Sequence, residues 1–532
     1  MRNPFILKSL LLAGSLSFAM AVQAQAPVKA KENWQNLDFK TDSVFGISTE
    51  KAYAELLKGK KSKPVLVAVI DGGVDIKHED LKQVIWNNPK EKAGNGKDDD
   101  KNGYIDDLHG WDFIGGAKGA VHWDNVEAVR LLRKYQAQFA NTTDSTKLSA
   151  DQRVQYRKYL KVKSEVSTKL TEAQQSVQGV GGFKRVLEGI LTKLNNQNPT
   201  LADFQKFEPA GDPETRVVGV VSNLLPQFKD FKDFKRQVID EAYDHYDTQV
   251  KYHYNVDFDS RSIVGDNYAN SNERNYGNAD VAGPDADHGS HVSGIIGAVR
   301  NNNLGIKGVA DNVMIMSVRT VPDGDERDKD VANAIRYAAA NGAKVINMSF
   351  GKGYSPDKKA VDEAIKFAIS KDVLLIHAAG NDNLNLEVDK NFPTPIFLDG
   401  SKATAWIEVG ASGPQDDKTL KAAFSNYGKN TVDVFAPGVD INSTVPGSKY
   451  DLHSGTSMAA PVVAGLAALI RSYYPKLSAM QVKDIILKSV VKIDHPITLK
   501  DGANDKEVAF ADLCKTGGIV NAYNALKLAA TY

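Results

Sequence analysis

Four polar side chains in separate parts of the chain are of types that together could support nucleophilic catalysis. Ser457 stands in residues 455–461, which read GTSMAAP and begin an apolar run typical of a buried helix, with Pro461 expected in its first turn. A helix N-terminus favours a developing negative charge, and the small neighbours leave space for a substrate backbone. By itself the stretch is also typical of a helix packed tightly on a sheet, so other residues must decide between these interpretations.

Acyl transfer by a serine requires a base to remove its proton, a carboxylate to orient the base and hydrogen-bond donors for the oxyanion. The chain offers His288 at a predicted helix start, Asp71 at the end of a predicted strand and Asn381 just after another strand. Taken singly, His288 could be a core histidine and Asp71 a turn residue. Taken with Ser457, they predict a catalytic triad and an oxyanion donor gathered at the carboxyl edge of one sheet.

Strands and helices that alternate along the chain would position these side chains. Apolar runs rich in β-branched residues, typical of strands buried on both faces, occupy residues 64–70, 313–321, 343–350, 373–379, 404–411 and 432–436. Helical patterns occupy residues 48–57, 328–341 and 357–371. We therefore predict an α/β fold of three layers, in which a mostly parallel sheet carries helices on both faces.

A long helical stretch, residues 119–254, interrupts this alternation. It is rich in Lys, Gln, Glu and Leu, and we expect three or four helices broken at residues 179–182 and 209–213. It contains two helix start signals, Ser149 with Gln152 and Thr200 with Asp203. Because nothing in the stretch indicates chemistry, we interpret it as an insertion that serves either as an interaction surface or as structural padding.

Residues 94–107 form an acidic loop that offers the oxygen ligands a hard cation prefers. Oxygen-bearing side chains alternate there, and Gly103 permits a sharp turn, but the position of the bidentate glutamate of an EF-hand falls on His109. The predicted Ca²⁺ ligands are Asp98, Asp100, Asn102, Tyr104 and Asp106. The alternative interpretation is a solvated acidic loop.

The N-terminus predicts export. Residues 1–24 combine an early positive charge, a short apolar segment and small residues before the expected cleavage site, a pattern typical of a secretory signal peptide. We expect a periplasmic or extracellular protein without stable membrane insertion after cleavage. The single cysteine, Cys514, excludes an internal disulfide, and 66 basic against 66 acidic residues give no indication of nucleic-acid binding.

The segments around the four candidate catalytic residues resemble the subtilisin-like serine proteases. Ser457 in GTSMAAP, His288 in HGSHVSG and Asp71 in VIDGGVDIKHEDL match the nucleophile, base and orienting carboxylate of that family, in the same chain order. Asn381 in AAGND matches the side-chain oxyanion donor. The resemblance implies that these four residues hold the corresponding roles here.

The resemblance covers residues 63–115 and 283–526 and implies a substrate groove as well. Residues 347–351 would form the strand that pairs with the substrate backbone, and residues 350–353 and 378–380 would line the S1 pocket. The implied substrate-binding residues are Ser349, Phe350, Gly351, Ala378, Ala379 and Gly380. The chain departs from the family pattern at Gly72, where serine or threonine is more usual, and residues 25–63 are too short for the inhibitory prodomain that many relatives carry.

These observations predict an exported serine endopeptidase that cleaves polypeptides through an acyl-enzyme. The expected organisation is a signal peptide (1–24), an N-terminal extension (25–62), a catalytic domain (63–118 and 255–532) and the insertion (119–254). We expect the insertion to bind a partner or to regulate access to the site. The alternatives are a protease-like binding scaffold, against which the intact triad argues, and an esterase, against which the missing GxSxG motif argues.

Overall fold

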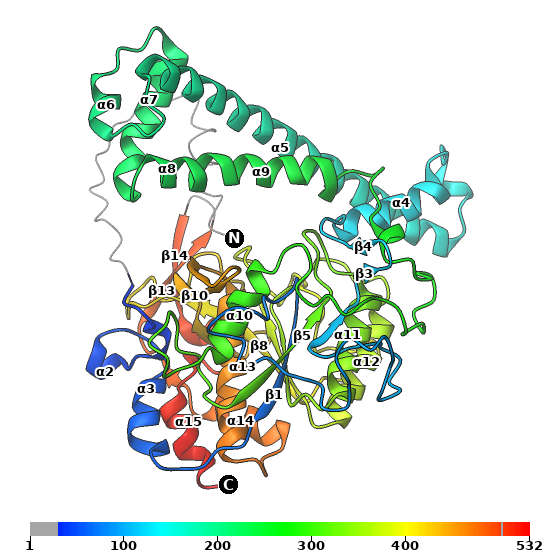
Figure 1. Cartoon of the computed structure of the whole chain (residues 1–532). Coiled ribbons are helices and arrows are strands. Elements are labelled where there is room, and N and C mark those ends of the chain that lie inside the picture. The colour runs from blue at the N-terminus through cyan, green and yellow to red at the C-terminus, as the bar shows by residue number, and fades with distance from the viewer. Residues whose placement is uncertain (1–29, 502–503) are drawn as a thin grey trace. The chain divides into compact units, whose positions relative to one another are not determined.

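The computed structural model describes residues 30–501 and 504–532, which divide into two compact units (Figure 1). The sheet unit comprises residues 30–127 and 259–532, and the helical unit comprises residues 128–258. The predicted signal peptide lies outside the described residues. The chain therefore leaves the sheet unit after Glu127 and returns to it at Asp259.

A nine-stranded sheet forms the centre of the sheet unit. In spatial order its strands are β12 (Val491–Lys492), β15 (Gly518–Ile519), β9 (Val434–Pro437), β8 (Trp406–Ser412), β7 (Leu374–Ala378), β6 (Val345–Met348), β1 (Val65–Asp71), β5 (Val313–Arg319) and β2 (Gly110–Asp112). Neighbouring strands are parallel except for the pair β12–β15. Val67 of β1 lies opposite both Ile315 of β5 and Val345 of β6, and the predicted mostly parallel sheet is confirmed.

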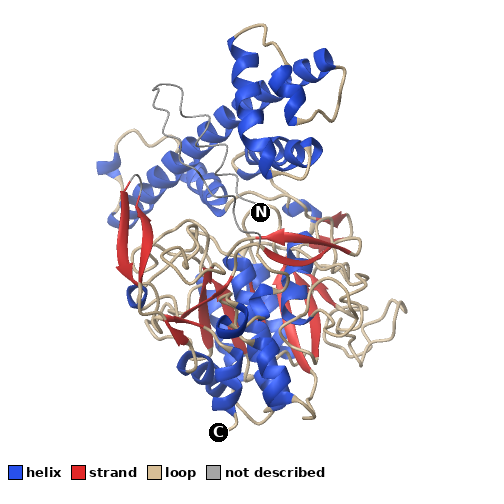
Figure 2. Cartoon of the chain, turned by 90° about the vertical axis from the view of Figure 1, so that its left-hand side faces the viewer, coloured by secondary structure: helices blue, strands red, loops and turns tan. Residues whose placement is uncertain are grey.

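Alternate residues of each central strand pack against helices on opposite faces of the sheet, because side chains along a strand alternate in direction. A hydrophobic core lies on each face of the sheet. In β1, Val65, Val67 and Val69 belong to the first core, and Leu66, Ala68 and Ile70 belong to the second. The helices of the first core are α10 (Asp287–Gly297), α13 (Thr456–Tyr473), α14 (Ala479–Lys488) and α15 (Ala522–Ala529). The second core holds α11 (Asp328–Ala340) and α12 (Lys358–Ser370), which confirms the three layers (Figures 1 and 2).

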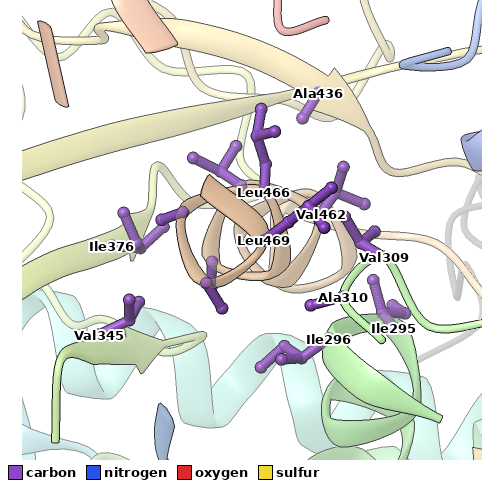
Figure 3. Close-up of a cluster of buried hydrophobic side chains, with 14 of the residues drawn as sticks. Ile295, Ile296, Val309, Ala310, Val345, Ile376, Ala436, Val462, Leu466 and Leu469 are labelled. Atoms are coloured by element: carbon purple, nitrogen blue, oxygen red, sulfur yellow. The ribbon is translucent and has the colours of Figure 1, made fainter. Parts of the chain in front are cut away.

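Helix α13 lies inside the first core. All of its residues from Met458 to Ser472 are buried. Figure 3 shows Val462, Leu466 and Leu469 surrounded by side chains of α10 and of strands β6, β7 and β9. Each fully buried aliphatic side chain contributes about 1.5–3 kcal/mol through the hydrophobic effect. Core packing therefore fixes the position of α13 and of Ser457 at its start.

Three hairpins outside the main sheet were not predicted, because their strands are short or carry many polar residues. They are β3 (Gly115–Gly116) with β4 (Gly119–Ala120), β10 (Ile441–Val445) with β11 (Lys449–His453), and β13 (Pro496–Asp501) with β14 (Asn504–Ala509). The β10–β11 hairpin bears on the site, since only residues 454–455 separate β11 from α13.

The segment before β1 packs into the sheet unit. It forms a 3₁₀ turn (Trp34–Asn36), α2 (Phe39–Asp42), α3 (Thr49–Ala52) and a π-helical turn (Tyr53–Leu57). Trp34 and Ile47 are buried in the same core as α13, and the Trp34 indole donates to the carbonyl of Val439 at 3.1 Å. The helix predicted for residues 48–57 is confirmed, with a change from α to π geometry within it.

The helical unit contains helices joined by loops (Figure 2). Its helices, with Glu127 of the sheet unit as the first residue of α4, are α4 (Glu127–Phe139), α5 (Ala150–Leu194), α6 (Leu201–Lys206), α7 (Asp212–Leu224), α8 (Phe231–Phe234) and α9 (Glu241–Thr248), with π-helical segments at Lys235–Asp240 and Gln249–His253. Capping boxes at Ser149 and Thr200 confirm the two start signals. The prediction of three or four helices was too low, because α6 and α8 are too short to give a periodic pattern.

The predicted helix break at residues 179–182 was wrong, and α5 continues through its glycines. Glycine in a helix costs about 1 kcal/mol relative to alanine. Here tertiary packing outweighs that preference: Val180 and Gly181 are buried, and a Cβ on Gly181 would lie 3.2 Å from the Tyr243 ring of α9. The break predicted at residues 209–213 is present between α6 and α7.

Candidate active site

Three adjacent strands place the candidate residues at one edge of the sheet. Asp71 is the last residue of β1, Ser349 directly follows β6, and Asn381 lies three residues beyond β7. The spatial order β7, β6, β1 brings these strand ends together. His288 and Ser457 are the second residues of α10 and α13, the two helices that pack on each other beneath the sheet.

Asp71 and His288 form the first contact of the predicted triad. His288 Nδ1 lies 2.8 Å from Asp71 Oδ1, which also accepts the Gly72 amide at 2.7 Å. Asp71 is buried, whereas the His288 side chain is one-third exposed. Burial acts to lower the pKa of His288, but the Asp71 carboxylate outweighs it, so the pKa is raised above its ordinary value. A proton held on Nδ1 leaves Nε2 free to accept one.

Gly289 allows α10 to approach the end of β1 this closely. A Cβ at Gly289 would lie 2.1 Å from the carbonyl oxygen of Gly73 and 3.2 Å from the Cβ of Asp71. Any side chain there would push the helix that carries His288 away from the carboxylate.

Ser457 is bound to the strand segment after β6. Its Oγ donates to the carbonyl of Ser349 at 3.1 Å, and the Ser349 hydroxyl donates back to the carbonyl of Ser457 at 2.9 Å. Pro461 is in the second turn of α13, not in the first as predicted, and it lacks the amide that would reach the carbonyl four residues earlier. That carbonyl belongs to Ser457, and the Ser349 hydroxyl takes the place of the missing donor.

Asn381 is oriented by the first residue of α13. Its Oδ1 accepts the Thr456 amide at 2.8 Å and the Thr456 hydroxyl at 3.0 Å, and the hydroxyl oxygen accepts the Gly380 amide at 3.1 Å. The amide nitrogen of Asn381 therefore points away from Thr456. A Cβ on Gly455 would lie 3.6 Å from both Asn381 Nδ2 and the Ser457 backbone nitrogen, so these two donors face the same space.

The predicted substrate-binding segments lie on either side of Asn391. Ser349, Phe350 and Gly351 follow β6 without belonging to a strand, and Gly351 is exposed. The Asn391 side chain donates to the carbonyl of Ala378 at 3.0 Å and would lie 2.2 Å from a Cβ on Gly351.

Ala379 cannot contact a substrate through its side chain, which is fully buried. Its amide donates to Val409 and its carbonyl accepts from Asn426. Gly380 is close by, and a Cβ there would lie 2.4 Å from Asn426 Nδ2. Of residues 378–380, only Gly380 is partly exposed, and its amide and carbonyl are already bonded to Thr456 and Asn426.

A histidine that the sequence did not single out joins the two catalytic helices. His453, at the end of β11, lies 3.3 Å from Asp287 Oδ2, measured from Nε2, and stacks on His291 with 4.1 Å between ring centres. His291 Nε2 lies 2.9 Å from the carbonyl of Ile441, and burial lowers its pKa to about 3. The hairpin that leads to Ser457 is thus packed on the helix that carries His288. Spacing along the chain gives no signal for such long-range contacts, and the same holds for Asn391.

The acidic loop gathers a different set of carboxylates from the predicted one. Within the described residues, Glu91, Asp100 and Asp107 each offer an oxygen within 4.8 Å of the others. Of the predicted ligands, Asp98 accepts the amides of Asn102 and Gly103, and Asp106 accepts those of Asn95 and Gly96. The Tyr104 ring packs on Trp111, Phe113 and Tyr337.

The three gathered carboxylates fit a hard cation. Glu91 is 8% exposed, its Oε1 accepts the amides of Asp99 and Asp100, and its buried Oε2 has no hydrogen-bond partner among the residues that the structure describes. Burial raises the pKa of Asp107 to about 6 against hydrogen bonds from Tyr337, Asn102 and Asn88. Oxygen ligands of this kind suit Ca²⁺.

Comparison with known proteins agrees with this geometry. The profile of the Subtilase family matches residues 62–511. The chain belongs to the subtilase family. It is 38% identical to the thermophilic serine proteinase of Bacillus sp. (strain AK1) over 227 aligned residues. The aligned residues cover 42% of this chain and 51% of that protein. It is 33% identical over 224 residues to subtilisin BL of Lederbergia lenta, covering 42% of this chain and 77% of that protein.

Other subtilases match over similar lengths. Alkaline elastase YaB of Bacillus sp. (strain YaB) is 32% identical over 223 residues, 42% of this chain and 54% of that protein. The chain thus spans about half the length of two of these three relatives. A solved structure of proteases from Pseudoalteromonas arctica PAMC 21717 is 28% identical with a TM-score of 0.39, over 47% of this chain and 78% of that chain.

We predict that Asn381→Ala lowers kcat by about 10²–10³, with little change in KM, because one of two oxyanion donors is lost. Thr456→Val should lower kcat less, since it removes one of the two hydrogen bonds to Asn381 Oδ1 and keeps Asn381 itself, and it should add little to Asn381→Ala. Steady-state kinetics on a peptide substrate test this, with the melting temperature as a control for folding. Equal kcat for Asn381→Ala and the wild type would contradict the role.

We predict that kcat/KM is lost as pH falls through the raised pKa of His288, because the imidazolium cannot accept the Ser457 proton. The Asp71→Asn variant should lose roughly four orders of magnitude in kcat, and its acid limb should move to lower pH because the carboxylate no longer favours the charged ring. The pH profile of kcat/KM measures both. An acid limb at the same pH in the two proteins would show that Asp71 does not set the pKa.

Proposed function

We propose that this protein is a serine endopeptidase that hydrolyses polypeptides through an acyl-enzyme. Ser457 is the nucleophile, His288 the general base and Asp71 the orienting carboxylate. The Ser457 backbone N–H and Asn381 Nδ2 are the oxyanion donors. The observation that carries the proposal is the 2.8 Å contact between His288 Nδ1 and Asp71 Oδ1 at the sheet edge where the first turn of α13 holds Ser457.

In the proposed reaction the Ser457 hydroxyl first turns from the carbonyl of Ser349 toward His288. His288 Nε2 takes its proton as Oγ attacks the peptide carbonyl carbon, and the oxyanion forms against the two donors. The C–N bond then breaks as the imidazolium gives its proton to the leaving amine. Water, activated by the same Nε2, hydrolyses the ester and restores the serine.

We further propose that Ser349, Phe350 and Gly351 pair with the backbone of the acyl part of the substrate. Asn391 extends the predicted S1 lining, because its side chain spans Gly351 and the segment 378–380. A polar amide at this position would limit the volume available to the substrate side chain before the cleaved bond.

Export remains part of the proposal and rests on the pattern of residues 1–24. Within the residues described, no helix combines the length and the apolar character needed to cross a bilayer.

We also propose that Glu91, Asp100 and Asp107 hold a structural Ca²⁺ ion. A bound cation would balance three clustered carboxylates and accept the unpartnered Glu91 Oε2 as a ligand. The loop lies outside the catalytic set, so its contribution would be to stability.

Reaction with a serine-directed phosphonylating reagent tests the catalytic proposal. We predict one label per molecule on Ser457, complete loss of casein hydrolysis after labelling, and no label on Ser457→Ala. A folded wild type that neither reacts with the reagent nor cleaves casein would support a binding scaffold instead. A short-chain ester assayed beside casein separates a peptidase from an esterase.

Calcium binding is tested by the melting temperature with and without a chelator. A ligand that binds only the folded state at about 100 times its Kd adds about 2.7 kcal/mol of stability, so chelation should lower the melting temperature of the wild type. Glu91→Gln should remove most of this response, and Asp106→Asn, outside the gathered set, should retain it. If Asp106→Asn lost the response and Glu91→Gln kept it, the ligands predicted from spacing would be supported instead. No response in the wild type would contradict calcium binding.

A further inference from the structure

A buried lysine directly follows the proposed substrate-binding segment, residues 349–351. Lys352 follows Gly351 and is only 5% exposed. Its ammonium group lies 2.8 Å from Glu127 Oε2 and 2.9 Å from Asp328 Oδ1, and it donates to the carbonyl of Glu326 at 2.7 Å. Both carboxylates are buried as well. Such a charge cannot move without losing partners that water does not replace.

The backbone of Lys352 is held at the same time. Its amide donates to the carbonyl of Phe392 at 3.0 Å, and the Phe392 amide donates back at 2.8 Å. Phe392 follows Asn391, whose side chain lies against Gly351. Lys352 is therefore fixed through both its backbone and its side chain, directly after the substrate-binding segment 349–351.

Glu127 links this lysine to the point where the chain leaves the sheet unit. It is the first residue of α4 and the last residue before the helical unit. Its amide donates to Asp325 Oδ2 at 2.7 Å, which fixes its backbone beside the residues that precede α11. The backbone of Glu127 is thus held in place, and this restricts where its carboxylate can lie.

Arg327 holds both connections to the helical unit. It binds the Asp124 carboxylate through two hydrogen bonds of 2.7 and 2.9 Å, and it donates to Asp259 Oδ1 at 3.2 Å. Asp124 precedes the departure of the chain from the sheet unit, and Asp259 is the first residue after its return. The two connections are thereby tied to the segment that also carries Asp328, the second carboxylate of Lys352.

We propose that Glu127 and Lys352 are positioning residues that fix the substrate-binding segment, residues 349–351, from the point where the chain leaves the sheet unit. The proposal rests on the proposed peptidase function and names a further determinant of its substrate affinity. Substrates long enough to pair with residues 349–351 depend on the contact, whereas short substrates that reach only Ser457 do not. Glu127, the last residue of the sheet unit before the helical unit, is then part of the framework that holds the substrate-binding segment.

The test compares long and short substrates on the full chain. Glu127→Gln keeps the size of the side chain but removes its charge. We expect KM for a tetrapeptide anilide to rise about tenfold, the size of one charge-assisted hydrogen bond, with kcat nearly unchanged. Kinetics on a single-residue ester and the rate of labelling by the phosphonylating reagent should stay within twofold of the wild type.

A control comes from another lysine–carboxylate pair of the sheet unit, in which the carboxylate is buried and the lysine is half-buried. Lys358 Nζ lies 2.5 Å from Asp362 Oδ1, and Asp362 is 5% exposed. Asp362→Asn should leave the ratio of long to short substrate kinetics unchanged. Lys352→Arg, which keeps the charge but changes the reach of the side chain, should raise the tetrapeptide KM even if Glu127→Gln fails to fold.

Each other outcome decides against the proposal. Equal losses on long and short substrates, or the same change of ratio in Asp362→Asn, would show a purely structural pair. An unchanged KM for the tetrapeptide in both Glu127→Gln and Lys352→Arg would show that the Glu127–Lys352 pair does not affect the binding of long substrates. A wild type that does not react with the phosphonylating reagent would instead contradict the peptidase function, so the two failures are distinguishable.

Discussion

The burial of helix α13 is the constraint on which the site depends. Its apolar residues fill the space beneath the sheet, and its first turn must therefore end at the carboxyl edge of β6 and β7. Pro461 leaves the carbonyl of Ser457 without an intrahelical donor, and Ser349 supplies one from the neighbouring strand segment. A helix start, a strand end and a proposed nucleophile are thus joined by one pair of reciprocal hydrogen bonds.

Several buried charges in this molecule are paired with an opposite charge. Asp71 has His288, and Lys352 has two carboxylates, so the desolvation of each is offset by close partners. Pairs on the surface, such as Lys429 with Asp512, contribute little because water screens them. In the acidic loop, Glu91 Oε2 lies beside two further carboxylates and has no hydrogen-bond partner among the described residues, so the loop suits a cation better than it suits a closed hydrogen-bond network.

The fold and the four catalytic candidates were predictable because they follow local rules. Apolar runs such as residues 64–70 give buried strands, and the motif around Ser457 is specific enough to imply a role by resemblance. The gathering of Glu91 and Asp107 with Asp100 was not predictable from spacing, because it depends on how the loop folds, and Asp98 and Asp106 instead accept nearby amides. Asn391, His453 and Lys352 act through contacts between distant segments, which no local pattern records. The glycines of α5 are a similar case. The helix continues through them because packing on Tyr243 outweighs the low helix propensity of glycine.

The place of β1 in the sheet has a consequence for biosynthesis. Both of its neighbours, β5 and β6, lie on the far side of the helical unit in the sequence. At about 5–20 residues per second, a ribosome takes on the order of tens of seconds to extend the chain from β1 to the end of β6. During that time the helices of residues 128–258 can form from local contacts, whereas β1 has not yet gained the strands with which it pairs. The nascent chain therefore passes through a long-lived state with an exposed strand, and holding that strand against aggregation is a demand that its topology places on the cell.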